Sequence, residues 1–279
     1  MRGAVRQAVT GIIPELEGRV YDVHPPNGAN DNLYAVIALG EDVWKSSWAG
    51  YRQVVRLKLY AGSSGLLQMD EWAKHLIKGL HRKRVTDTED EAFILHYLGV
   101  SEADKLDPVS GKTFRLLRFG VYIPETSGAG STAQPDEWLD ALAAWTGDLL
   151  GDPWRIYHTA WPAGRDDYAI LWRMTGCETK SAGASMYEIR KSFIGHVASP
   201  VLGSEQLAIV KLVEALGSKV QLLLDSEDRR YVSVVDVSSD LQADPILDGQ
   251  LKLTLMQRKM RPAEEAALIR RVNIHPILK

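Results

Sequence analysis

The sequence predicts an α+β protein made of two tandem, similar units, and three observations support this. Strand-like segments group around a long helix in each half, without the regular strand–helix alternation of a parallel α/β fold. Similar motifs recur at an offset near 136 residues, the distance from Arg19 to Arg155. A stretch rich in Gly, Ser, Ala, Thr and Pro at residues 126–136 separates the halves, which is typical of a linker.

The repeated motifs indicate an internal duplication. Arg19-Val20-Tyr21 corresponds to Arg155-Ile156-Tyr157, and Asp107-Pro108 corresponds to Asp244-Pro245. A constant offset over several elements is the signature of a repeat. The expected domains are a first unit at 1–125, a linker at 126–136, a second, diverged unit at 137–261, and a C-terminal helix and tail at 262–279.

The first unit is expected to contain two helices and five strands, because its segments show helical spacing or strand-like alternation of apolar residues. In chain order these are a helix at 3–15, strands at 19–24, 33–39 and 51–61, a helix at 67–82, and strands at 92–99 and 113–123. The basic run HRKR at 81–84 and the acidic run DTEDE at 87–91 are interpreted as a solvated helix end and loop. A basic patch that contacts phosphate or an acidic partner is the alternative.

The second unit is expected to repeat this order. Its elements are a helix at 137–150, strands at 153–159, 167–174 and 186–198, a helix at 203–217, and strands at 230–237 and 250–260. Ser204 is a plausible N-cap and Gly217 a plausible stop for the second helix. Polar loops follow the second main strand of each unit, GEDVWKSSWAG and TGCETKSAGAS. The simplest arrangement is one mixed or antiparallel sheet per unit, with both helices on one face.

Composition excludes several classes of protein. The 279 residues carry 33 Lys and Arg against 36 Asp and Glu, so the basic excess of a tight nucleic-acid binder is absent. One cysteine, Cys177, rules out an internal disulfide and makes a cysteine zinc cluster improbable. No apolar run approaches the roughly 20 residues that span a bilayer. The N-terminal residues lack the apolar block of a secretory signal, so we expect a protein that is not secreted.

The search for catalytic motifs finds no phosphate-binding loop, dinucleotide fingerprint or metal-ligand spacing among the histidines. Asp166-Asp167 fits a turn. The alternative interpretation is a metal-dependent hydrolase that uses Asp166, Asp167 and His158. Trp44 and Trp48 are unusual because they lie in a polar loop, where large aromatics either fold back on the core or anchor a partner. Trp residues of the second unit fall on or beside strands and are expected in the core; these are Trp154, Trp161 and Trp172.

The order of motifs in the first half resembles the tail-terminator proteins of long-tailed bacteriophages, which complete the tail and join it to the head. The resemblance rests on RVYDVHPPNGANDNLYAVIALGE, a polar loop, YRQVVRLKLYAGSSG and an amphipathic helix, and extends more weakly to RIYHTAWPAGRDDYAILW. It implies a fold similar to tail-tube subunits. It also implies a structural, non-enzymatic virion protein of the tail or neck, present in the host cytoplasm during assembly. The family has one unit per chain, whereas this sequence carries two.

The resemblance further implies a homo-hexameric ring, with a trimer of two-unit chains as the alternative. Its partners would be the tail-tube protein and a head-completion or connector protein. DNA would pass through the lumen without specific binding, and no cofactor, metal, catalytic residue or membrane would be involved. The other candidates are a neck or baseplate adaptor of a phage-like injection machine and, less favoured, the hydrolase. The expected contacts lie in loops 41–50 and 175–186 and in segment 262–279, through Trp44, Lys45, Trp48, Lys180, Arg270, Arg271 and Ile274.

Overall fold

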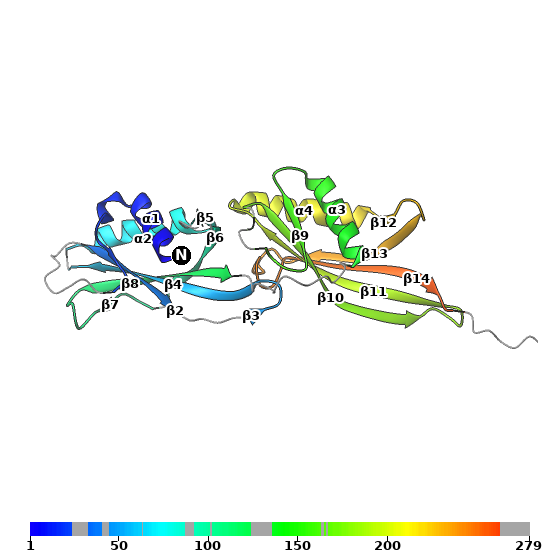
Figure 1. Cartoon of the computed structure of the whole chain (residues 1–279), viewed down its shortest axis with the longest axis horizontal. Coiled ribbons are helices and arrows are strands. Elements are labelled where there is room, and N and C mark those ends of the chain that lie inside the picture. The colour runs from blue at the N-terminus through cyan, green and yellow to red at the C-terminus, as the bar shows by residue number, and fades with distance from the viewer. Residues whose placement is uncertain are drawn as a thin grey trace, which may run out of the picture.

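The computed structural model describes residues 1–23, 33–40, 45–62, 64–86, 92–100, 102–123, 136–162, 165 and 167–262. The molecule is elongated, and two α+β units lie side by side along its long axis (Figure 1). The first unit comprises the described residues up to 123, and the second those from 136 to 262.

The first unit contains two long helices and a sheet. Its elements are α1 (Arg2–Ile12), a short 3-10 helix (Pro14–Leu16), β1 (Val20–Tyr21), β2 (Tyr34–Gly40), β3 (Lys45–Ser46), β4 (Gly50–Ala61), α2 (Leu66–Leu80), β5 (Lys83–Thr86), β6 (Ala92–Val100), β7 (Lys105–Leu106) and β8 (Thr113–Ile123).

The second unit repeats the pattern. Its elements are α3 (Glu137–Leu150), β9 (Arg155–His158), β10 (Ala169–Ser181), β11 (Met186–Ala198), α4 (Leu202–Ser218), β12 (Gln221–Asp225), β13 (Arg230–Ser239) and β14 (Leu251–Met260).

The two sheets have the same topology. The strand order is β1-β2-β4-β8-β6-β5 in the first and β9-β10-β11-β14-β13-β12 in the second. In each, the first pair is parallel, with Val20 opposite Ala35 and Ile156 opposite Ile170, and the remaining pairs are antiparallel. The sequence-based prediction of an α+β fold with two similar units is therefore confirmed, and the repeat is one of topology as well as of motif.

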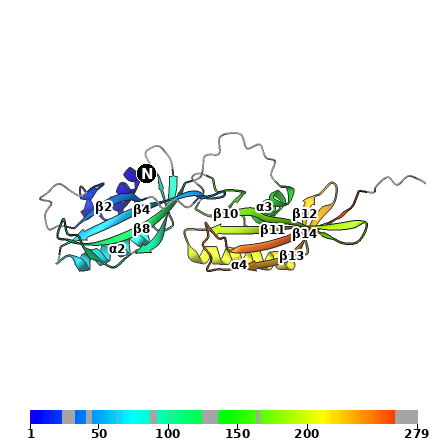
Figure 2. The ribbon, with the colours of Figure 1, turned by 90° about the horizontal axis from the view of Figure 1, so that it is seen from below.

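Both helices of each unit cover the same face of their sheet (Figures 1 and 2). In α2, the buried residues Trp72, Ala73, Leu76 and Leu80 follow the spacing of one helical face and pack in the core of the first unit. In the second unit, the buried Trp172 packs in the core with residues of α3 and α4. Burying one such large apolar side chain contributes about 1.5–3 kcal/mol, so these faces hold the helices on the sheets.

Three local predictions were wrong. The segment TGCETKS was expected to be loop, but β10 continues to Ser181 in register with β11. Its sequence resembles a loop because both faces of the strand are exposed, so apolar and polar residues do not alternate. Backbone hydrogen bonds to β11 hold this part of the strand. The run at 81–84 does not form only a helix end, because Lys83–Thr86 is strand β5, which pairs with β6. Ser204 is not the N-cap of α4, which begins after Val201 and runs past Gly217 to Ser218.

Two further expectations lie outside the described residues. They are the linker, apart from Asp136, and the C-terminal helix and tail beyond Pro262. Among the helices of the described ranges, none combines the length and apolar character needed to cross a membrane.

Candidate assembly surfaces at the junction and the projecting sheet

The first unit contacts the second through a turn that presents Trp48. The Ser46 hydroxyl accepts a hydrogen bond from the Ala49 amide at 2.9 Å, and Gly50 adopts a φ of 73° that favours glycine. This turn places the Trp48 indole N–H 3.2 Å from the Ile246 carbonyl oxygen of the second unit. The Trp48 carbonyl in turn accepts a hydrogen bond from the Trp161 amide at 2.7 Å.

Apolar side chains from both units pack together around Trp48. The buried members and their half-buried neighbours are Trp48, Ala49, Tyr122, Tyr157, Trp161, Ala169, Leu171, Ala198, Ile246 and Leu247. The Arg173 guanidinium covers the Trp48 ring at 3.9 Å from its centroid, a cation–π contact. A mixed cluster of this kind, with aromatic anchors and hydrogen bonds, is typical of a specific interface. We call it the junction.

A buried histidine completes the junction on the side of the second unit. His196 Nδ1 donates to the Pro245 carbonyl at 3.1 Å, and its Nε2 accepts from Arg173 Nε at 2.8 Å. Burial and the neighbouring Arg173 charge lower the pKa of His196 to about 4, against the opposite effect of the Pro245 hydrogen bond. His196 is therefore neutral at pH 7, which is the state in which Nε2 can accept.

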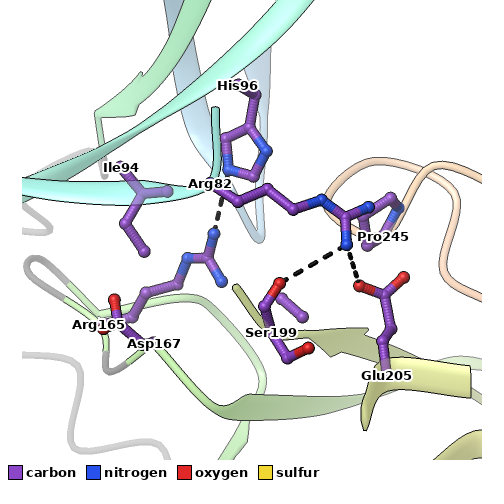
Figure 3. Close-up of a pocket in the computed structure, with 9 residues that line it drawn as sticks. Arg82, Ile94, His96, Arg165, Asp167, Ser199, Glu205 and Pro245 are labelled. Atoms are coloured by element: carbon purple, nitrogen blue, oxygen red, sulfur yellow. Dashed lines mark hydrogen bonds and ion pairs between the residues drawn. The ribbon is translucent and has the colours of Figure 1, made fainter. Parts of the chain in front are cut away.

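An ion pair between half-buried Arg82 and buried Glu205 also crosses the junction. Arg82 lies at the turn between α2 and β5 with a φ of 59°, which is strained for a residue with a Cβ. Its Nη1 lies 2.5 Å from Glu205 Oε2 and 3.5 Å from the Ser199 carbonyl (Figure 3). Gln250 Nε2 donates to the other Glu205 oxygen at 3.1 Å. Burial raises the pKa of Glu205, and Arg82 works against that rise.

A second polar contact joins His96 of β6 to Arg165 of the second unit. Arg165 Nη2 lies 3.1 Å from His96 Nε2 (Figure 3). Burial, followed by the Arg165 charge, lowers the pKa of His96 well below its usual value. Burial lowers the pKa of Arg165 to about 10, so the guanidinium stays charged at neutral pH. The neutral imidazole therefore accepts from a charged donor, which is a strong form of hydrogen bond.

These ionisable groups surround a small pocket between the units. Its lining residues are Arg82, Ile94, His96, Arg165, Asp167, Ala198, Ser199, Glu205 and Pro245. Its free volume of about 10 Å³ suffices for about one water molecule. Among the described residues, Arg165 Nη1 and Asp167 Oδ1 are buried there without a hydrogen-bond partner. The converging charges therefore form a polar seam between the units.

The residues suggested for a metal-dependent hydrolase are not brought together. His158 Nε2 lies 3.8 Å from Asp140 Oδ1 beside α3, whereas Asp167 lines the junction pocket. Asp166 lies outside the described residues. In the described part of the chain, no group of three or more His, Cys, Asp or Glu side chains could hold a metal ion.

The far end of the second sheet projects beyond its helices (Figure 1). β9 pairs with β10 only from Ala169 to Trp172, so the remainder of β10, Met174–Ser181, has an open edge within the described structure. Eight residues at about 3.3 Å each give an edge of about 26 Å. Such an edge presents unpaired backbone groups that can pair with another chain. We call Met174–Ser181 of β10, together with the paired parts of β11 (Met186–Phe193) and β14 (Leu253–Met260), the projecting sheet.

Charged residues keep the projecting sheet soluble. Lys180 Nζ lies 3.5 Å from Glu178 Oε1 on exposed β10, a weak contact in water. Glu188 of β11 accepts from Arg190 at 3.0 Å and from Arg258 of β14 at 3.1 Å. These two arginines lower the pKa of Glu188. Charged side chains such as Glu178 and Lys180 on the open part of β10 limit non-specific pairing at this edge.

The residues expected to form interfaces fall in different places. Trp48 lies in the junction within the chain, Lys45 is exposed on β3 and pairs in the ladder with Tyr51, and Lys180 lies on the projecting sheet. Trp44, Arg270, Arg271 and Ile274 lie outside the described residues.

Sequence reasoning missed the partners of Trp48. Trp161, expected in the core, is buried in the junction, and Arg82, expected in a solvated run, makes the ion pair with Glu205. The signal available for both was a large or basic residue beside a turn. That signal does not show which distant segment the residue contacts, because Trp48 and Ile246, like Arg82 and Glu205, are more than a hundred positions apart.

No protein-family model matches the chain, and no curated protein matches it. The fold, the junction and the projecting sheet are therefore the observations on which a functional proposal rests.

Proposed function

We propose that this protein is a structural virion component that forms a ring at the head-proximal end of a phage tail tube. There it ends tube growth and joins the tail to the head. The proposal rests mainly on the projecting sheet, which is exposed and has an open edge. The opposite end of the same sheet already packs against the first unit. A surface with an open edge is suited to association with further subunits.

The duplicated fold supports an assembly role. Two units of one topology meet through unlike surfaces, so the chain itself contains a heterologous contact. Contacts of this type generate rings when the rotation between units closes. The sequence resemblance to tail terminators suggests which assembly this is. In it, a ring of this protein would bind the tail-tube protein on one side and a head connector on the other.

The charged groups around the junction pocket support an assembly role. Arg82 and Glu205 are engaged with each other across the units. The near balance of 33 basic and 36 acidic residues suits a lumen through which DNA slides, because few phosphate contacts would hold it.

Binding to tail tubes tests this proposal. Tubes polymerised from the tail-tube protein of the same genome are mixed with the purified full-length chain, sedimented and imaged by electron microscopy. We expect rings on one end of each tube and an arrest of further tube growth. Absence from tube ends, together with absence from purified virions by mass spectrometry, would refute the proposal.

A further inference from the structure

Each unit has two different ends, and the junction uses one end of each. The first unit contributes the turn with Trp48 and the side chain of Arg82, and we call this end of a unit its donor end. The second unit contributes the loop between β13 and β14, which contains Ile246, and we call this end its receptor end. Because the topologies are equal, the first unit also has a receptor end and the second also has a donor end.

The receptor loops of the two units are built alike. In the second unit, Asp244 Oδ1 accepts from the Ile246 amide at 2.8 Å, and the Asp244 carbonyl accepts from Gly249. In the first unit, Asp107 Oδ2 accepts from the Ser110 amide at 3.1 Å, and its carbonyl accepts from Gly111. Both loops precede equivalent strands, β14 and β8. The residue after the Asp-Pro pair is Ile246 in one loop and Val109 in the other.

The exposure of these equivalent residues differs sharply. Ile246 is 2% exposed and packs in the junction cluster that contains Trp48, whereas Val109 is 86% exposed. Leu106 of β7, which precedes the loop with Val109, is 68% exposed, and Leu67 in the first turn of α2 is 81% exposed.

Ion pairs hold that loop beside the helix. The Arg115 guanidinium lies 2.6 Å from Asp70 of α2 and 2.6 Å from Asp104 of the loop. Leu67, Leu106 and Val109 therefore lie at the same end of the unit, and all three are exposed. We call these three residues the open receptor.

The donor end of the second unit is also exposed within the described residues. It is the projecting sheet, where Met260 is 75% exposed and lies opposite Met186 in the ladder between β14 and β11. Met174 is also exposed where β10 loses its partner β9. Methionine side chains adapt to irregular apolar surfaces, so this end suits a contact with Leu and Val side chains.

One difference between the receptors predicts the strength of the contact. In the second unit, Ala169 lies opposite Ala198, and these small residues belong to the cluster that contains Trp48 and Trp161. At the equivalent pair of the first unit, Tyr34 and Tyr60 stack with centroids 4.7 Å apart. The tyrosines occupy that space, so a partner reaches mainly the loop surface and binds more weakly than at the junction.

We propose that the open receptor binds the projecting sheet of a second copy of this chain, in the head-to-tail order that the junction displays within one chain. The partner is another copy because the contact repeats one that the two units already make. Repetition of this heterologous contact joins chains in one direction and closes into a ring at a fixed rotation. The inference rests on the proposed function, since it names the contact between ring subunits.

Native mass measurement on full-length variants tests the contact. Val109→Glu and Met260→Glu place a charge in either side of it, and Leu207→Glu is the matched control because Leu207 is 73% exposed on α4 of the occupied receptor end. We expect wild type and the control to assemble. We expect the other two variants to assemble about tenfold more weakly, as for loss of one well-packed contact. Thermal melts establish that each variant is folded.

Cross-linking provides a second readout that does not depend on loss of assembly. Cys177 is the single cysteine of the chain and lies exposed on the projecting sheet. With Val109→Cys, a bismaleimide should link Cys177 of one copy to the new thiol of the next and produce a ladder of multimers. Leu207→Cys should give no ladder above the wild-type pattern.

The outcomes separate this inference from the proposed function. If wild type assembles, both glutamate variants assemble equally well and no ladder forms, the contact is wrong while a ring remains supported. If wild type stays monomeric at its highest soluble concentration, both ideas are overturned. If the contact behaves as expected but the rings do not bind tail tubes, the contact stands and the tail-terminator function fails.

Discussion

The end of the first sheet that faces the second unit and the projecting end of the second sheet have the same strand order but different surroundings. The first is covered by a neighbour and carries Trp48 and Arg82, which contact Ile246 and Glu205. The second extends past its helices with exposed Met260 and a row of charges. The comparison teaches that the same end of one fold can be buried against a neighbour or left exposed, according to the side chains that it carries.

The largest effect is expected from breaking the ion pair of the covered end, because its carboxylate is buried. Arg82→Met leaves the buried Glu205 carboxylate without its charged partner, with hydrogen bonds only from Gln250 and the Ser199 backbone, which should cost about 3–5 kcal/mol of folding free energy. Glu205→Gln in the same chain removes the uncompensated charge and should restore much of the loss. Urea unfolding of the single and double variants measures both. Equal destabilisation by the single and double variants would contradict a role for the charge.

The next effect is a dependence of stability on pH. Because the pKa of His196 is lowered from 6.5 to about 4, the unfolded chain binds a proton that the folded chain excludes between these values. The free energy of unfolding should therefore be highest above about pH 6.5 and fall by up to about 3 kcal/mol toward pH 4. Protonation of Nε2 would also end its hydrogen bond from Arg173.

The control for this titration is the variant His196→Gln, whose carbonyl oxygen can still accept from Arg173. Its stability should decline less steeply between pH 6.5 and pH 4, as measured by chemical denaturation at each pH. Parallel slopes for wild type and His196→Gln would show that this histidine is not responsible.

Trp48→Ala should have a smaller but clear effect, about 2 kcal/mol, because it removes an anchor of the junction. Hydrogen exchange should increase in residues 240–250, which Trp48 covers through Ile246. Trp48→Phe retains most of the apolar area and loses the N–H donor, so its cost should be about 1 kcal/mol. Unchanged exchange in the loop after Trp48→Ala would mean that the units do not depend on this contact.

The smallest effect is expected at the uncovered end. Lys180→Glu changes an exposed side chain with a weak contact to Glu178, so thermal stability should change by less than about 0.5 kcal/mol. The same change should alter the salt dependence of assembly if the projecting sheet meets a charged partner. A large loss of stability would indicate that Lys180 contributes to the fold itself.

Much of the fold could be predicted from the sequence because its elements have regular patterns. Trp72, Leu76 and Leu80 mark one face of α2, and the alternation in β8 and β14 reports sheets with one buried face. The outer half of β10 could not be predicted, because a strand exposed on both faces leaves no apolar period. The candidate surfaces were predicted in part, since Trp48 and Lys180 were singled out but not their surroundings.

The sequence by itself determined that the chain has two related α+β units, since burial of one helical face and one sheet face leaves a period in the residues. Only the tertiary structure decided that Trp48 meets Ile246, that Arg82 meets Glu205, and that Val109 stays exposed while its counterpart is buried. The physical reason is that local patterns record what a segment must bury. They do not record which distant surface buries it, because that depends on how two complete units pack.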